Sequence, residues 1–245
     1  MLQKGRKYSE DYTAFLDKES LKGKRIGMWT QPKGVVAEVD SLYEQAVNQL
    51  EELGATVISI DSISADATSA YSFEIMLYEY KDGLNKYFAS LGPQSRIHSL
   101  EDLIAFNKTD SVELSFYGQE YLIAAEEKGP LTDEVYLDAL SEMKRLSQAE
   151  GIDRVLQEQQ LDAIIAPTGS PAWTTTQGEG DNYILGTSSP AAQAGYPAVT
   201  VPMGFVDGLP VGLSFFSTAW TEGALIGMAY SYEQATKFRK APELQ

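Results

Sequence analysis

The stretch from Leu161 to Gly212 constrains the fold more than any other part of the chain, because a strand, a long loop, a short helix and a hairpin follow one another in it. Asp162 to Ala166 is mostly apolar, and the PTGSP run that follows contains residues that cannot continue a strand ladder. The long loop therefore begins at the carboxyl end of a strand. In open α/β sheets ligands usually bind at that edge, so we expect the functional site there.

A short helix is predicted after this loop. Ser188 and Ser189 precede Pro190, and a serine hydroxyl can accept a hydrogen bond from the first free backbone N–H groups, while proline fits the first helical turn. Residues 191–194 then form a turn of helix that Gly195 closes. Their small side chains allow the helix to approach the sheet closely.

The remaining strands are predicted from apolar runs bounded by turn signals. A first strand at 25–29 and a second at 56–60 flank a helix that starts at a Ser41 cap and ends at Gly54, which is the pattern of a parallel βαβ unit. Two further strands, at 198–201 and 211–216, are joined through an Asp207-Gly208 turn, and Pro202 is expected to end the first of them. Thr221 is expected to cap a final helix.

Residues 69–155 are expected to be largely helical. A helix at 71–89 carries a broad aromatic stripe, which we interpret as core packing, with an aromatic wall beside a substrate cleft as the alternative. Ser99 and Thr132 have the acidic neighbours of helix starts. We predict that residues 1–245 form a single α/β domain or part of one, with a mixed β-sheet flanked by helices and a helical cover at about residues 69–158.

Composition excludes several classes of function. The net charge of −16, from 19 basic and 35 acidic residues, argues against a nucleic-acid partner. With no cysteine and with His98 as the one histidine, neither a metal site nor a disulfide is expected, and no dinucleotide-binding pattern indicates a cofactor. No apolar run is long enough to span a membrane, and residues 1–7 do not have the pattern of a signal peptide. We therefore expect a soluble, cytoplasmic protein.

Three segments carry a family resemblance. APTGSPAW, SSPAAQAGYPAVTVPMGFVDGLPVGLSFF and AWTEGALIGMAYSYEQAT, in this order, resemble the C-terminal half of amidase signature enzymes, most closely the peptide amidase type. DYTAFLD and LKGKRIGMW near the start are similar to the middle of such enzymes, so the resemblance spans the whole chain. It implies the C-terminal half of the amidase signature fold and an enzyme that hydrolyses carboxamide or peptide amide C–N bonds.

The resemblance also implies a catalytic triad of serine, cis-serine and lysine, in which an unprotonated lysine is the base. In the family the two serines lie in a GGSSGGS-like segment, and these 245 residues contain no such segment. The most similar runs, at 168–170 and 186–189, match other parts of the family pattern. We therefore expect no catalytic residue in this chain and no amide hydrolysis by the chain alone.

Four residues are expected to bind substrate in the complete enzyme. Trp173 is a candidate for the rim of the cleft, Asp181 for a polar or cationic part of the substrate, and Ser188 and Ser189 for hydroxyls in the pocket. Each has a structural alternative: the tryptophan can anchor the loop, the aspartate can form a turn, and the serines can cap the helix.

Three functions remain open. The chain is the C-terminal portion of an amidase, a noncatalytic binding or interaction protein derived from that fold, or a fragment of the A subunit of a tRNA-dependent amidotransferase. The expected partners are a small-molecule or peptide amide substrate, the missing N-terminal half and a second copy of the chain, because a sheet cut from a larger one exposes an unpaired edge and apolar surface. No cofactor, nucleic acid or membrane is expected as a partner.

Overall fold

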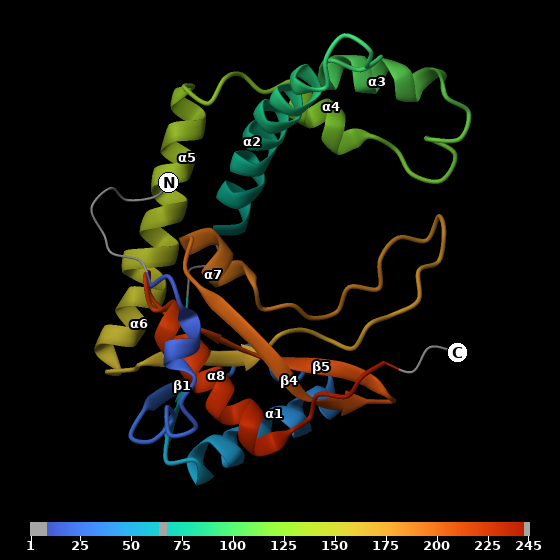
Figure 1. The fold of residues 1–245 in the computed structure, drawn as a ribbon. Helices are drawn as coiled ribbons and strands as arrows, with labels where there is room; N and C mark the ends of the chain where they lie inside the picture. Colours follow the sequence, from blue (N-terminus) through green and yellow to red (C-terminus); the bar gives the residue numbers. More distant parts are fainter. Residues whose placement is uncertain (1–8, 64–67, 243–245) are drawn as a thin grey trace. The chain divides into compact units, whose positions relative to one another are not determined.

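The computed structural model describes residues 9–63 and 68–242 (Figure 1). These residues form two compact units. The sheet unit contains residues 9–63, 147–173 and 183–242, and the helical unit contains residues 68–146 and 174–182. The long loop predicted at the centre of the chain is therefore divided between them. The single domain predicted from the sequence stays a prediction.

The sheet unit is built on five strands in the order β2-β1-β3-β5-β4. The first three are parallel, β5 is antiparallel to β3, and β4 is antiparallel to β5. The strands are β1 (Arg25–Trp29), β2 (Thr56–Ile60), β3 (Ala163–Pro167), β4 (Ala198–Val206) and β5 (Leu209–Phe216). The mixed β-sheet flanked by helices that the sequence predicted is confirmed.

Helices cover both faces of this sheet. The first face packs on α1 (Ala37–Glu52) and α8 (Glu222–Thr236), and the second on α6 (Asp153–Glu158) and α7 (Ser189–Ala194). The 3₁₀ helix η1 (Tyr12–Phe15) and the π-helical segment η2 (Gln148–Ile152) complete the unit. Since successive side chains of a strand point to opposite faces, Ile165 belongs to the first core cluster and Ile164 to the second.

Two sequence predictions about element boundaries are wrong. Helix α1 begins at Ala37, and Ser41 lies inside it, where its hydroxyl donates to the Ala37 carbonyl at 3.1 Å. Strand β4 continues through Pro202, with a shift of register between Pro202 and Gly204. Proline has no backbone N–H to donate to a neighbouring strand. It is tolerated at this position because β4 is an edge strand and because the shift of register next to Pro202 interrupts the regular hydrogen bonding with β5.

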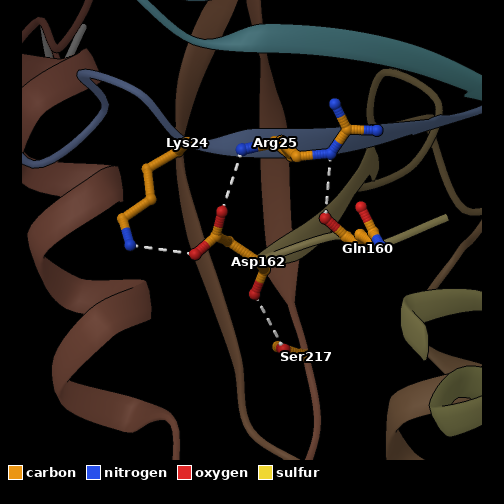
Figure 2. A network of polar contacts seen from close by, with 5 residues as sticks. All are labelled: Lys24, Arg25, Gln160, Asp162 and Ser217. Atoms are coloured by element: carbon orange, nitrogen blue, oxygen red, sulfur yellow. Dashed lines mark hydrogen bonds and ion pairs between the residues drawn. The ribbon is translucent and has the colours of Figure 1, made fainter.

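A polar network fastens the amino ends of β1 and β3 together (Figure 2). The Asp162 carboxylate accepts from the Arg25 backbone N–H and from Lys24 Nζ, each at 2.9 Å, and the Ser217 hydroxyl donates to the Asp162 carbonyl at 3.0 Å. Arg25 Nε donates to the carbonyl of Gln160 at 3.0 Å. These contacts fix the sheet at one end and leave its carboxyl edge for the loops.

The helical unit consists of α2 (Thr68–Ser90), α3 (Leu100–Thr109), α4 (Glu120–Glu126) and most of α5 (Glu134–Ser147). Helix α2 packs on α5 through a cluster that includes Tyr78 and Tyr136, and on α3 and α4 through a cluster that includes Leu77 and Ala125. The Ser99 hydroxyl accepts from the Asp102 N–H at 3.0 Å, which confirms the predicted start of α3.

The core interpretation of the aromatic stripe on α2 is wrong for four of its residues. Phe73, Met76, Tyr80 and Tyr87 are 44%, 47%, 42% and 57% exposed, respectively. The helix buries two other faces, one toward α5 and one toward α3 and α4, and these four residues lie on a third face that is only partly covered. At the start of this face the Phe73 ring contacts Tyr121 of α4 at a centroid distance of 5.7 Å. None of the helices in the described part of the chain is long and apolar enough to cross a membrane.

Candidate functional site

The loop between β3 and α7 leaves and rejoins the sheet at one point, the carboxyl end of β3. The buried Thr187 hydroxyl donates to the Pro167 carbonyl at 2.6 Å, and the Thr187 N–H donates to the Thr168 carbonyl at 3.3 Å. One step further along, the Ser170 N–H donates to the Leu185 carbonyl at 3.1 Å. The first and last residues of the loop therefore lie side by side at the edge where a ligand was expected.

Three hydroxyl groups gather beside this point, and we call them the hydroxyl cluster. Thr168 Oγ1 and Ser214 Oγ lie 2.8 Å apart, Thr200 Oγ1 and Ser214 Oγ lie 3.0 Å apart, and Thr168 donates to Thr200 at 3.4 Å. Gly212 makes room for them, because a Cβ at this position would lie 2.7 Å from both Thr168 Oγ1 and Thr200 Cγ2. Thr168, which directly follows β3, thus forms a small polar surface together with Thr200 of β4 and Ser214 of β5.

The hydroxyl cluster is suited to binding by hydrogen bonds. Each hydroxyl can donate to one neighbour and accept from the other, so each oxygen keeps a lone pair for a further donor such as an amide N–H. The Ser170 hydroxyl, also at this edge, is buried and has no hydrogen-bond partner within residues 9–63 and 68–242. A serine or threonine hydroxyl becomes a nucleophile only with an adjacent base, and these contacts are with hydroxyls and backbone groups.

The position of α7 beside this edge is fixed from two sides. Gln148 Nε2 donates to the Ala194 carbonyl at 2.7 Å, and the Tyr196 hydroxyl donates to Asp153 Oδ2 at 2.7 Å. Burial, and after it the hydrogen bond to Asp153, raises the pKa of Tyr196 to about 12. Gly195 closes the helix in the left-handed region with φ 66°, as the sequence predicted.

Ser188 and Ser189 are exposed at the start of α7, and the predicted capping role of their hydroxyls is wrong. Ser188 has helical backbone angles of φ −74° and ψ −24° and makes no side-chain cap hydrogen bond. A capping hydroxyl needs an extended backbone at its own residue to reach the next free N–H groups. The Ser188 carbonyl instead accepts from the Ala192 N–H at 3.1 Å, as in an ordinary helical turn.

Trp173 lies in the loop of the sheet unit, 38% exposed, with its ring packed edge-on against Tyr183 at a centroid distance of 6.3 Å. Asp181 is exposed and belongs to the helical unit, where the nearby Gly178 N–H donates to the Tyr117 hydroxyl at 3.4 Å. The predicted substrate-binding roles of Trp173, Asp181, Ser188 and Ser189 stay predictions.

Sequence reasoning missed the hydroxyl cluster and Thr187. A signal for the cluster exists in the alternation of the strands, because Ser214 occupies a position on the same face as the buried Phe216. A polar residue at such a position indicates a polar partner on the neighbouring strand. No group of three or more carboxylates or histidines is placed to hold a metal ion within the described ranges.

Comparison with known proteins places the chain in a family. The amidase family model matches residues 3–226. The chain is 34% identical over 240 residues to a probable amidase of Arabidopsis thaliana, covering 95% of the chain and 42% of that protein. It is 30% identical over 245 residues to the A subunit of the glutamyl-tRNA(Gln) amidotransferase of Clostridium botulinum, covering 94% of the chain and 48% of that protein.

Solved structures give the same result. A peptide amidase in complex with the competitive inhibitor chymostatin matches with a TM-score of 0.91 and 44% identity, covering 99% of this chain and 49% of that one. The native peptide amidase of Stenotrophomonas maltophilia matches with a TM-score of 0.88 and 43% identity, covering 98% and 48%. The chain therefore spans about half the length of these relatives. Together with the family model, these similarities show that the chain belongs to the amidase family.

Proposed function

We propose that this chain is the C-terminal portion of an amidase signature hydrolase that cleaves carboxamide or peptide amide C–N bonds. The observation that carries the proposal is the similarity to peptide amidases over nearly the whole chain, at 44% identity and with a TM-score of 0.91, together with a coverage of 49% of the relative. The serine, cis-serine and lysine of the resemblance are then supplied by the N-terminal portion.

In this proposal the chain supplies binding groups and the other portion supplies the reacting groups. The hydroxyl cluster and the Ser170 hydroxyl lie at the carboxyl edge of β3, where ligands of α/β sheets usually bind. Trp173, Asp181, Ser188 and Ser189 contribute substrate contacts from the loop and from the start of α7. No cofactor is required, and the cytoplasmic location expected from the sequence stays part of the proposal.

The proposal is tested first on the purified chain with a panel of peptide amides and small carboxamides, by measuring released ammonia. We expect no turnover, because hydroxyls without an adjacent base do not perform acyl transfer. Turnover that Ser188→Ala or Ser189→Ala abolishes would place the nucleophile in this chain and refute the division of roles.

Asp181 is tested in an active assembly that contains this chain. Asp181→Ala is expected to raise KM for substrates with a cationic or polar group and to leave kcat nearly unchanged, because it removes a binding contact and no reacting group. Glu179→Ala, a change of a neighbouring exposed carboxylate, is the matched control. A fall in kcat with unchanged KM would contradict the role given to Asp181.

The A subunit of an amidotransferase is the second candidate, and the 30% identity to the Clostridium botulinum protein supports it. The 44% identity to a peptide amidase favours the hydrolase. A noncatalytic binding protein derived from the same fold is the remaining alternative. It is distinguished from both enzymes if the chain binds peptide amides but gains no activity with any N-terminal portion of a relative.

A further inference from the structure

The partly exposed residues on the third face of α2 have a regular spacing in the sequence. The exposed residues Phe73, Met76, Tyr80, Gly83 and Tyr87 follow one another at intervals of three and four residues, which places them in one stripe along the helix. From the first to the last the stripe is about 21 Å long, at 1.5 Å per residue. Such a seam is typical of a helix that packs against another helix.

The part of the stripe from Met76 to Tyr87 matches a second copy of itself when the two helices run antiparallel, whereas Phe73 contacts Tyr121 of its own chain. Pairing positions whose numbers add up to 163 places Tyr80 opposite the partner's Gly83 and Met76 opposite the partner's Tyr87. Gly83 leaves open space above the helix, since a Cβ at this position would meet no atom within 4 Å. The large tyrosine of each helix therefore faces the glycine of the other, which lets the two backbones approach closely.

The charges beside the stripe agree with the same register. In antiparallel helix pairs, the residues directly before alternate seam positions flank the seam and face their counterparts on the other helix. Here these residues are Glu79, directly before Tyr80, and Lys86, directly before Tyr87, and their numbers add up to 165. Glu79 of each helix then faces Lys86 of the other, so two ion pairs of opposite charge flank the seam. Both side chains are exposed, with the Glu79 carboxylate also accepting from the Tyr136 hydroxyl at 2.9 Å and Lys86 also paired with Asp82 at 2.6 Å.

We infer that the α2 stripe is a self-association surface through which two copies of this chain form an antiparallel, two-fold symmetric dimer. The two-fold axis passes between residues 81 and 82 of the two helices, so one patch meets an identical patch. The inference specifies the second copy that the sequence only named as a partner. It does not depend on amide hydrolysis, so it stands or fails independently of the proposed function.

Sedimentation equilibrium of the full chain, from low micromolar to several hundred micromolar protein, measures this association. The wild-type mass is expected to rise toward that of a dimer with concentration. Glu79→Lys places a lysine opposite Lys86 of the partner, and Lys86→Glu places a glutamate opposite the partner's Glu79, so each variant alone should dimerise at least about tenfold more weakly.

An equimolar mixture of these two variants is the decisive sample. In a mixed dimer both flanking pairs again join opposite charges, so the mixture should recover the wild-type dissociation constant within a few-fold. Lys144→Glu, on the exposed surface of α5, is the control for a change of net charge and should leave association unchanged. A mixture that associates no better than either variant, or a wild-type chain that stays monomeric throughout the range, overturns the inference.

Gly83→Leu distinguishes an effect on dimerisation from an effect on the stability of the monomer. Leucine has the higher helix propensity and there is room for its Cβ, so the thermal midpoint of a dilute, monomeric sample should rise. The same side chain occupies the space for the partner's Tyr80, so the dimer should weaken. Unchanged association of a folded Gly83→Leu chain would refute the register.

Discussion

Thr187→Val tests how the loop is fastened to the end of β3. Thr187 is 3% exposed, and its hydroxyl donates to the Pro167 carbonyl at 2.6 Å. Valine has nearly the same shape, so the change opens no cavity but leaves a buried carbonyl without its donor. The expected loss in the free energy of unfolding is about 1–3 kcal/mol, the cost of an unsatisfied buried polar group.

The assay is equilibrium unfolding in urea at 25 °C, with Ser188→Ala as the matched control. Ser188 is the next residue in sequence, is exposed and makes no side-chain cap hydrogen bond, so its replacement should change the free energy by less than about 0.5 kcal/mol. Equal stability of Thr187→Val and wild type would refute the anchoring role. A loss of about 1 kcal/mol in Ser188→Ala would show that the serine does cap α7.

Three further predictions concern stability. Asp162→Ala should lower the free energy of unfolding in urea by about 2–3 kcal/mol, because the Arg25 N–H loses a charged acceptor, while the half-exposed ion pair with Lys24 adds little. Asp162→Asn keeps an oxygen acceptor and should lower it by about 1 kcal/mol. Equal losses for the two variants would contradict this. Burial raises the pKa of Tyr196 from 10.0 to about 12, so its contribution to stability is complete below pH 10.0 and is lost as the pH rises through about 12. The difference in stability between wild type and Tyr196→Phe should therefore shrink over that interval, and a constant difference would count against it. Dialysis against a chelator should leave the thermal midpoint unchanged, and a fall would indicate a metal site.

The strands were the part of the fold that sequence reasoning predicted best. β1 and β2 have the predicted bounds, because each is a short apolar run between clear turn signals. The pairing of β4 with β5 followed from Asp207 and Gly208, which both have positive φ, of 50° and 81°. The end of β4 was missed because proline breaks a central strand but is tolerated in an edge strand, and strand order is a property of the whole sheet.

Caps and exposed faces were predicted less well, for a physical reason. Whether Ser41 or Ser188 caps a helix depends on the backbone angles of that residue, which packing on the sheet decides. The stripe on α2 has the period of a buried face, but α5 and the pair α3 and α4 occupy the other two faces of the helix. In the candidate site, the hydroxyl cluster depends on the register of the β4–β5 hairpin and on the pairing of β5 with β3, which the local sequence does not specify.

The division of roles between two portions of one enzyme is tested most directly by complementation. The chain is co-expressed with the N-terminal portion of a peptide amidase relative, and ammonia release from a peptide amide is measured for each portion alone and for the copurified pair. We expect no activity for either portion alone and hydrolysis by the pair. Hydrolysis by this chain alone, abolished by Ser188→Ala or Ser189→Ala, would contradict it, as would a stable copurified pair that does not hydrolyse amides.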